Sequence, residues 1–327
     1  MTAPLLSIEN LSVVFETDEG HVESVDGLDL EIGAGEIVGL VGESGSGKSV
    51  SAYAVLRLIR PPGRIVRGAI RLNGKDLLGL SETEMRRVRG PDIAMIWQNP
   101  RTALNPVIPV GRQISRLFEL HRGADAAAAR KRTLEMLQLV GIPEPERRAR
   151  QYAHQLSGGR CQRVMIAMAL ATAPKLLSAD APTTGLDVSI AARIMDLLRE
   201  LGPRTGAAIL LITHDLGIVA ESCQRVAVMH AGQLVETAPV RTLFREPAHP
   251  YTRALVRSIP RVDRDVALEP IPGAVPSLLD PGPGCRYAER CPLVADRCRH
   301  EKPRLAVIAA AHAVACFAVE ESRVAAA

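Results

Sequence analysis

The residues with the clearest chemical capability form a glycine-rich loop, residues 42–49, of sequence GESGSGKS. The loop fits the pattern G-x-x-x-x-G-K-[ST], and it lies between an apolar run that predicts a buried strand over 37–41 and a helical pattern over 48–59. Glycines let backbone N–H groups converge on phosphate oxygens, and the helix N-terminus adds a favourable dipole. Lys48 can reach the β- and γ-phosphates of a nucleotide, and the Ser49 hydroxyl can ligate Mg²⁺. The alternative, a flexible Gly/Ser turn, leaves the flanking strand and helix unexplained, so we predict a nucleotide-binding loop.

An acidic residue, Asp180, ends a second predicted buried strand, which begins at Lys175. A carboxylate at the carboxyl end of a strand, beside a phosphate loop, is placed to hold Mg²⁺ through water. Strands often end in aspartate, so Asp180 alone would not indicate a metal ligand. It does so in combination with the glycine-rich loop. Together the two motifs predict a site for a nucleotide with its magnesium ion.

A third segment, residues 156–160 of sequence LSGGR, opens a predicted helix over 158–171. Serine and glycines at a helix N-terminus offer hydrogen-bond donors to a phosphate. The segment resembles the signature motif of ABC ATPases. Gln98 resembles the Q-loop glutamine of that family, residues 186–187 resemble the D-loop, and His214, after a predicted strand over 209–213, resembles the switch histidine. Because these motifs occur in the family's order, the sequence is identified as a member of the ABC ATPases.

The resemblance implies that the chain binds ATP and Mg²⁺, and that its signature motif acts on ATP bound to a partner subunit. It implies catalytic roles for Gln98, Asp180, Asp187 and His214, and Mg²⁺ ligation by Ser49, Gln98 and Asp180. The implied ATP contacts are Gly42, Glu43, Ser44, Gly45, Ser46, Gly47, Lys48, Ser49, Val50, Phe15, Ser157, Gly158 and Gly159. Purely structural roles are the alternatives: a core strand residue for Phe15, a loop glutamine for Gln98 and a capping or core histidine for His214.

Strands alternate with helices along most of the chain, which predicts an α/β fold with a largely parallel core sheet. The resemblance refines this to an ABC cassette, with a RecA-like parallel-sheet core, an antiparallel β subdomain and a helical subdomain at about 99–165. We predict an ATP-binding domain over residues 1–258. Beyond it, prolines, glycines and cysteines dominate, so residues 259–327 are predicted to form a small cysteine-rich extension.

Composition excludes several classes of protein. Apolar residues make up 47% and charged residues 23% of the 327 residues, an ordinary globular mixture that argues against wholesale disorder. Aromatic residues make up only 3%, and the net charge is +4, so nothing points to a nucleic-acid partner. The sequence contains no apolar stretch long enough to span a bilayer, and residues 1–4 do not begin a secretory signal. We therefore expect a cytosolic protein.

Three segments resemble the ATPase subunits of dipeptide, oligopeptide and nickel importers: residues 104–107, residues 249–255 and the cysteine-bearing tail. The resemblance implies a peripheral subunit on the cytoplasmic face of the cell membrane. The implied partners are two transmembrane permease subunits, a second ATPase subunit that forms a heterodimer with this one, and an extracytoplasmic solute-binding protein. The transported solute is chosen by the permease and the binding protein, so this chain does not name it.

One position departs from the family pattern. Ala181 follows Asp180 where the family normally has the glutamate that activates the attacking water. A methyl group cannot accept a proton, so we expect hydrolysis at this site to fall by roughly 10²–10⁴-fold, while ATP binding persists. Two explanations stay open: a substitution introduced to trap ATP, or a naturally degenerate site whose partner hydrolyses ATP.

Four of the six cysteines lie in the tail: Cys285, Cys291, Cys298 and Cys316. In a cytosolic chain such cysteines are thiols or metal ligands more often than disulfides. Their spacing is not that of a zinc ribbon, yet four thiolates can surround one metal centre. The resemblance implies a [4Fe-4S] cluster with a structural role, and zinc, free thiols or an adventitious disulfide are the alternatives.

The sequence thus predicts the ATP-binding subunit of an ABC importer for peptides or similar small solutes, powered by closure of an ATP sandwich. Ala181 favours a second hypothesis, an ATP-binding regulatory subunit with hydrolysis only at the partner's site. A third, a soluble ABC ATPase that acts on nucleic acid or ribosomes, lacks a second cassette and a basic run in this sequence.

Overall fold

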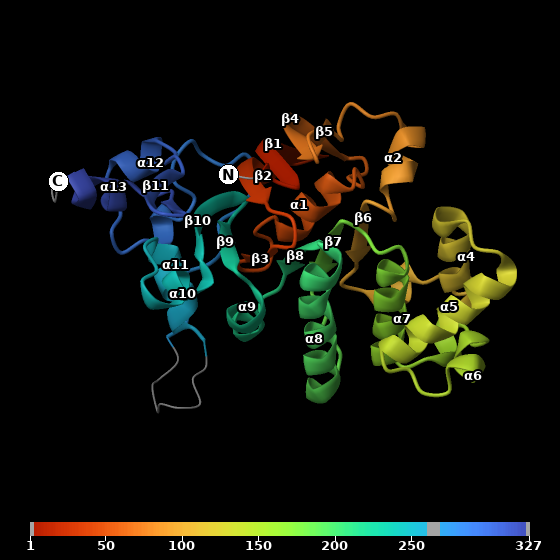
Figure 1. Cartoon of the computed structure of the whole chain (residues 1–327). Helices are drawn as coiled ribbons and strands as arrows, with labels where there is room; N and C mark the ends of the chain where they lie inside the picture. Colours follow the sequence, from red (N-terminus) through yellow and green to blue (C-terminus); the bar gives the residue numbers. More distant parts are fainter. Residues whose placement is uncertain (1–2, 260–268, 325–327) are drawn as a thin grey trace. The chain divides into compact units, whose positions relative to one another are not determined.

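The computed structural model describes residues 3–259 and 269–324 (Figure 1). The chain forms two compact units. Unit 1 comprises residues 1–32, 38–78 and 212–327, and unit 2 comprises residues 33–37 and 79–211. The first residues of the predicted extension, 260–268, lie outside the described residues.

Unit 1 contains an antiparallel sheet of four strands in the order β2-β1-β4-β5. The strands are β1 (Leu6–Thr17), β2 (Gly20–Ile32), β4 (Gly63–Leu72) and β5 (Lys75–Asp76). β1 pairs with both β2 and β4, and its apolar side chains Leu6, Ile8 and Leu11 are fully buried. Asn73 and Gly74 both have positive φ angles and make the tight turn between β4 and β5.

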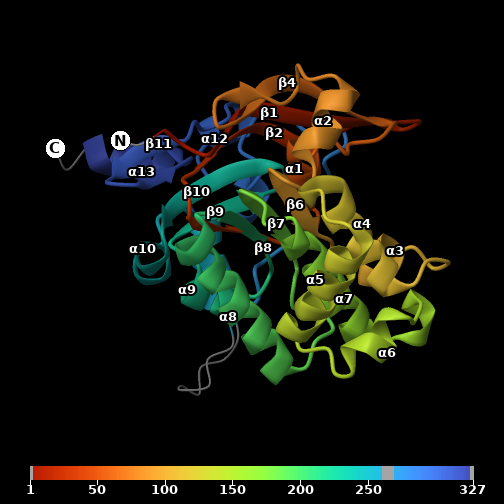
Figure 2. The ribbon, with the colours of Figure 1, turned by 45° about the vertical axis from the view of Figure 1, so that its right-hand side comes forward.

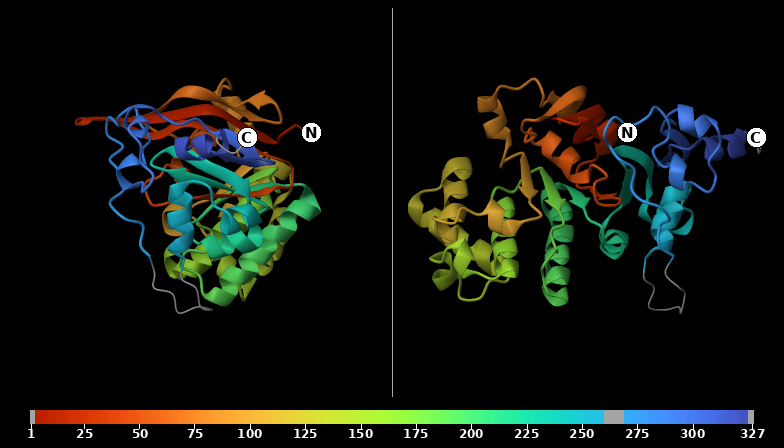
Figure 3. Two further views of the ribbon diagram at one scale, coloured as in Figure 1. Left: turned by 90° about the vertical axis from the view of Figure 1, so that its left-hand side faces the viewer. Right: turned by 180° about the vertical axis from the view of Figure 1, so that it is seen from behind.

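Unit 1 also contributes five strands to the larger sheet, in the order β11-β12-β10-β9-β3. They are β3 (Ile37–Val41), β9 (Arg225–His230), β10 (Gln233–Pro239), β11 (Ala306–Ala309) and β12 (His312–Val314). β3 is parallel to β9, whereas β9 and β10 form an antiparallel hairpin and lie side by side in Figure 2. The two extension strands add to the edge at β10, so the extension shares a sheet with the hairpin (Figure 3).

The helices of unit 1 are short. They are α1 (Lys48–Val55), α9 (Leu216–Ser222), α10 (Val240–Arg245), α11 (Pro250–Arg257), η2 (Ala288–Arg290), α12 (Arg297–His300) and α13 (Phe317–Val324). α1 ends four residues earlier than the pattern over 48–59 predicts, because Arg57 adopts a left-handed conformation with φ +51° that a helix cannot continue.

Unit 2 contains three strands in the order β8-β7-β6: β6 (Ile93–Ile96), β7 (Leu176–Asp180) and β8 (Ala208–Ile212). β6 and β7 are parallel, and every residue of both strands is buried, as in strands that are covered on both faces. The buried strands predicted from the apolar runs are thereby confirmed at β3, β7 and β8.

The helices of unit 2 include the cluster α4 to α7 that Figure 2 shows gathered together. The bounds are α2 (Glu82–Val88), α3 (Pro100–Ala103), α4 (Val110–Arg122), α5 (Ala126–Leu139), α6 (Pro145–Ala149), η1 (Ala153–Gln155), α7 (Gly158–Ala171) and α8 (Val188–Thr205). Gly123, in the left-handed conformation with φ 60°, ends α4, and the Asp125 side chain caps α5. Among the helices of the described residues, none is both long and apolar enough to cross a membrane.

Candidate functional site

The glycine-rich loop in unit 1 connects the buried strand β3 to helix α1, as predicted. Two of its glycines are required by close approach of the backbone. Gly42 has φ +147°, and a Cβ there would lie 2.1 Å from the carbonyl oxygen of Met229. Gly47 has φ +95°, and a Cβ there would lie 2.3 Å from the carbonyl oxygen of Ser24. The loop therefore holds a tight path that only glycine permits at both ends.

Lys48, the first residue of α1, folds over this loop. Its ammonium group donates to the carbonyl oxygens of Gly42 at 2.8 Å and Glu43 at 2.7 Å, and to the Ser46 hydroxyl at 3.0 Å. Ser49 follows in the first turn of α1. A cation and a hydroxyl thus sit at the start of a helix whose N-terminal N–H groups favour an anion.

His214 lies in the same unit, in the loop after β8. The backbone N–H of Thr213 donates to the carbonyl oxygen of Leu40, the residue before the last of β3, at 3.5 Å. The Asp215 side chain caps α9 by accepting from Gly217 and Ile218, so Asp215 rather than His214 is the capping residue. His214 itself is exposed. Because this bond joins the segment after β8 to the end of β3, His214 lies near the start of the phosphate loop.

Phe15, the predicted adenine contact, is half-buried in β1. Its ring packs closely on Gly63 at the start of β4, where a Cβ would lie 2.5 Å from the ring edge. This packing on β4 accounts for part of the ring's burial.

Unit 2 holds Gln98 and Asp180 at one edge of its sheet. Ile96, which ends β6, pairs in register with Ala179 of the parallel strand β7. Gln98 is exposed two residues beyond β6, and Asp180 is only 3% exposed at the end of β7. The amide oxygen of Gln98 and the carboxylate of Asp180, like the Ser49 hydroxyl in unit 1, are hard oxygen ligands of the kind that Mg²⁺ prefers. In unit 2, the donors at Gln98 and Asp180 are thus of a chemistry that fits magnesium.

Ala181 follows directly and is 6% exposed. Its φ is +48°, a left-handed conformation uncommon for a residue other than glycine, and its carbonyl oxygen accepts from the N–H of Thr184. The backbone after Asp180 is thus a tight turn, and the side chain at its first position is a methyl group, which cannot accept a proton.

The signature segment begins α7 in unit 2. Ser157 is the N-cap residue, and its carbonyl oxygen accepts from the N–H groups of Arg160 and Cys161. A Cβ added to Gly158 would meet no described atom within 4 Å, whereas one on Gly159 would lie 3.3 Å from the Leu186 side chain. The N-terminus of α7 is therefore open at Gly158 and packed on the predicted D-loop at Gly159.

The predicted D-loop leads into α8. The carbonyl oxygen of Asp187 accepts from the N–H groups of Ile190 and Ala191, so Asp187 lies directly before that helix and accepts bonds from its first turn. A second tie joins α7 to the preceding turn, because the Gln162 amide donates to the carbonyl oxygen of Pro182 at 2.9 Å. Unit 2 thus brings the signature segment, the turn after Asp180 and Asp187 into one packed group.

The four tail cysteines lie close enough for their charges to interact. Burial raises the pKa of Cys285 to about 11, and the neighbouring Cys298, Cys291 and Cys316 raise it further. Burial likewise raises the pKa of Cys291 and Cys316, so these thiols are protonated near neutral pH. Across the described residues, no group of three or more histidine, cysteine, aspartate or glutamate side chains could hold a metal ion. The predicted four-cysteine metal centre is therefore not supported by the described residues of the structure.

Sequence reasoning missed the side chains that hold the phosphate loop from outside. Arg290 of the extension pairs with Glu43, and the Tyr251 hydroxyl accepts from the Glu43 N–H. A signal was available in the sequence. A carboxylate inside an anion-binding loop opposes its function, so Glu43 requires a cation to neutralise it.

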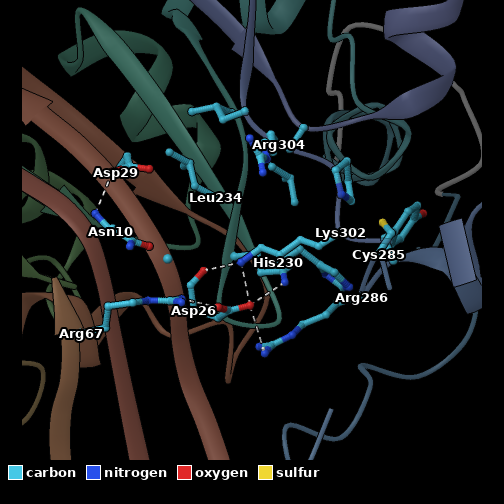
Figure 4. A pocket seen from close by; sticks show the side chains of 17 residues that line it. Asn10, Asp26, Asp29, Arg67, His230, Leu234, Cys285, Arg286, Lys302 and Arg304 are labelled. Atoms are coloured by element: carbon cyan, nitrogen blue, oxygen red, sulfur yellow. Dashed lines mark hydrogen bonds and ion pairs between the residues drawn. The ribbon is translucent and has the colours of Figure 1, made fainter. Parts of the chain in front are cut away.

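A polar cavity of about 660 Å³ lies where the extension meets the antiparallel sheet in unit 1 (Figure 4). Among the charged side chains that line this cavity, Asp26 contacts several of the others. Its side chain accepts from Lys302 at 2.7 Å and Gln233 at 2.9 Å, and it lies 3.5 Å from Arg286 and 3.3 Å from Arg67. Burial raises the pKa of Asp26, but Lys302 and Gln233 outweigh burial, so the net pKa is lowered. The carboxylate is thus ionised and joins the extension to β2.

Two family models match the chain. The model for ABC transporters matches residues 25–184, which include the phosphate loop, the signature segment and Asp180. The model for the C-terminal region of oligopeptide/dipeptide transporters matches residues 235–298, which include Tyr251 and Arg290.

Curated relatives and solved structures agree with these matches. The chain is 49% identical over 320 residues to a probable peptide ABC transporter ATP-binding protein of Sinorhizobium fredii, covering 97% of this chain and 96% of the relative. It is 47% identical over 306 residues to a dipeptide transport ATP-binding protein of Escherichia coli, covering 93% and 94%. The structure of an ATP-binding cassette in a dimeric post-hydrolysis state, bound to ADP and Pi, matches with a TM-score of 0.67 and 28% identity, covering 72% of this chain and 99% of that one. The cassette fold is thereby confirmed.

Proposed function

This chain belongs to the family of ATP-binding proteins of peptide ABC transporters, and we propose that it is the ATP-binding subunit of an importer for peptides or similar small solutes. The observation that carries the proposal is the path from β3 through the glycine loop to α1, with Lys48 folded over the loop. That path presents backbone N–H groups, a helix N-terminus and a cation to one anion.

We assign each residue a role from its chemistry. The loop N–H groups and Lys48 bind the β- and γ-phosphates of ATP, and Phe15 stacks on adenine. His214, exposed at the edge where the loop begins, donates to the γ-phosphate. The open N-terminus of α7 at Ser157 and Gly158 binds ATP held by the partner subunit, and Asp187 lies beside that contact. Closure of the two subunits on ATP then drives the permease.

Ser49, Gln98 and Asp180 would hold Mg²⁺, which when bound offsets the charge of the phosphates. What this chain supplies is the position of each oxygen: the first turn of α1 for Ser49 and the ends of parallel strands for the other two. Gln98 also orients the attacking water.

Ala181 supports a second role that differs in where hydrolysis occurs. With a methyl group at the position of the general base, this chain binds ATP and completes the sandwich, while its partner's site hydrolyses ATP. We propose this division of labour as the alternative to a fully active subunit, together with pairing to a different ATPase chain.

Two permease subunits and a solute-binding protein complete the proposed importer, with this chain bound at the cytoplasmic face of the membrane. The relatives are named as ATP-binding proteins of peptide and dipeptide transport, which supports a role beside a permease. The weaker alternative, a soluble ABC ATPase without a permease, predicts recovery with RNA, DNA or ribosomes instead.

An iron–sulfur centre is a separate proposal that leaves the nucleotide role unchanged. It is supported by the resemblance of the tail to those of related transporters and by the mutual influence of the four thiols. The ligand arrangement itself is not present among the described residues.

The test uses a strain deleted for the chain. Peptide uptake is expected to stop on deletion, to return with the wild-type chain and to stay absent with Lys48→Ala. Affinity purification of the wild-type chain is expected to recover hydrophobic permease subunits. Normal peptide uptake in the deletion strain, together with recovery of nucleic acid instead of permeases, contradicts the importer.

A further inference from the structure

An arginine of the C-terminal extension holds a residue inside the phosphate loop. Arg290 ends η2, and its two terminal guanidinium nitrogens lie 2.7 and 3.0 Å from the two carboxylate oxygens of Glu43. This is the bidentate arrangement, in which two parallel hydrogen bonds fix both the distance and the orientation of the carboxylate. The Arg290 side chain is 4% exposed and that of Glu43 22%, so water screens the pair only weakly.

The Arg290 guanidinium is itself fixed by its neighbours. Its Nε donates to the carbonyl oxygen of Pro272 at 2.8 Å, and the guanidinium carbon lies 5.7 Å from the centre of the Tyr287 ring. A cation fixed on two further sides cannot follow a moving carboxylate, so Glu43 is held in one place.

A second contact holds the backbone of the same residue. The N–H of Glu43 donates to the Tyr251 hydroxyl at 3.0 Å. The Tyr251 ring is fully buried against His230, at 4.4 Å between ring centres, and against Tyr287, at 5.4 Å. Both the main chain and the side chain of Glu43 are thus anchored to the part of unit 1 that packs against the extension.

The electrostatic effect of the pair reaches the nucleotide. Burial raises the pKa of Glu43, but the hydrogen bonds and charge of Arg290 outweigh burial and lower the net pKa, so the carboxylate is charged. A charged carboxylate one residue from Gly42 and five from Lys48 would repel phosphates if it were unpaired. Arg290 cancels that charge where it arises.

We propose that Arg290 is a positioning residue through which the C-terminal extension sets the affinity of the phosphate loop for nucleotide. The proposal rests on the proposed function, because it requires that the loop bind ATP. Arg290 acts through Glu43: it keeps the loop in its binding conformation and removes a repulsive charge. Both effects strengthen the binding of ATP and of ADP, since both nucleotides place a β-phosphate in the loop.

The test measures ATP and ADP affinity of the full chain by calorimetry, with thermal unfolding recorded for every variant. Arg290→Ala is expected to raise the dissociation constants for ATP and ADP about tenfold, within the range usual for coupling between sites. Arg290→Lys, which keeps the charge but not the bidentate geometry, is expected to fall between it and wild type. Calorimetry reports the bound fraction separately from the dissociation constant, so partial unfolding lowers stoichiometry and leaves the affinity of folded molecules readable.

Glu43→Gln and the double variant distinguish positioning from direct contact of Arg290 with phosphate. If Arg290 acts through Glu43, Glu43→Gln weakens binding slightly, and Glu43→Gln with Arg290→Ala binds more tightly than Arg290→Ala alone, because no unpaired carboxylate remains. If Arg290 were a phosphate ligand, Glu43→Gln would free it and strengthen binding, and the double variant would match Arg290→Ala; that result overturns the proposal.

Arg297→Ala is the matched control. Arg297 belongs to the same extension, but its exposed side chain pairs with Glu301 at 2.9 Å. The Arg297→Ala variant is therefore expected to bind nucleotide with wild-type affinity. A folded Arg290→Ala with wild-type affinity contradicts the proposal. A wild-type chain that binds no ATP instead contradicts the proposed function, so the two failures are distinct.

Discussion

The ammonium group of Lys48 lies 2.8 Å from the carbonyl oxygen of Gly42, so the first residue of α1 bonds back to the first residue of the phosphate loop. The bond spans the loop from end to end. The Lys48 ammonium group therefore contributes to the shape of the loop and is also placed to meet an anion that enters it.

Lys48→Ala is expected to abolish tight binding of Mg-ATP. The change removes the cation that bonds Gly42, Glu43 and Ser46, and with it both the order of the loop and the attraction to phosphate. Calorimetric titration measures the loss. Lys75→Ala, which removes an exposed lysine of unit 1 at β5, is the control and should bind as wild type. Unchanged affinity in Lys48→Ala contradicts the assignment of the loop.

Ala181→Glu is expected to raise ATP hydrolysis in the assembled transporter. The substitution restores a proton acceptor beside Asp180, and a positioned general base contributes roughly 10²–10⁴-fold. Phosphate release is measured with the hydrolytic site of the partner ATPase inactivated, so that any gain arises here.

Ala181→Gln is the matched control for that experiment, since glutamine has the size of glutamate but cannot act as a base. It should remain as slow as wild type. Equal rates for the glutamate and glutamine variants would mean that this site lacks more than its base. The φ of +48° at Ala181 is already left-handed, so both variants carry the same backbone cost.

The free energy of unfolding is expected to fall as the pH drops from about 6.5 to about 4. Burial lowers the pKa of His230 to about 4, with Glu43 opposing and Arg290 supporting the shift, and burial lowers that of His249 to about 3. Over this range the unfolded chain binds a proton at His230 and the folded chain does not, so stability rises with pH. A shift of this size corresponds to about 3 kcal/mol, present above pH 6.5 and lost by pH 4.

Urea unfolding at a series of pH values checks this prediction. His230→Gln removes one of the titrating groups and should make the dependence on pH shallower over that range. His154→Gln, which changes an exposed histidine in unit 2, should leave the slope as in wild type. An identical slope in His230→Gln and wild type would show that His230 is not buried in its neutral form.

Metal analysis tests the proposal of an iron–sulfur centre. Chain purified without oxygen is expected to absorb broadly in the visible range and to contain about four iron atoms. Cys316→Ser should reduce the iron content while ATP binding persists. Cys223→Ser, outside the tail, is the control. Stoichiometric zinc in colourless protein would correct the metal, and metal-free protein with an ordered tail would exclude the centre.

Local features of the sequence were enough to predict the strand, loop and helix around residues 37–55 and helix α7. Each depends on neighbours in the chain: apolar periodicity, glycines at turns and residues that begin helices. The helical subdomain at about 99–165 was predicted without its division into separate helices, although Gly123 at a left-handed position marks the end of α4.

The motifs of the family were likewise readable, because a phosphate site requires particular residue types at fixed short spacing. The sequence by itself therefore determined the family, the phosphate loop and the substitution at Ala181.

Only the tertiary structure decided what holds the loop. Glu43 and Arg290 are 247 positions apart, and Glu43 and Tyr251 are 208 apart. Charge alone allows any of the 40 lysines and arginines to pair with Glu43. The choice of Arg290 follows from packing, because the pairing of β12 with β10 and the buried ring of Tyr287 bring η2 to the phosphate loop. Contacts of this kind depend on how distant segments share one core, and no local pattern encodes them.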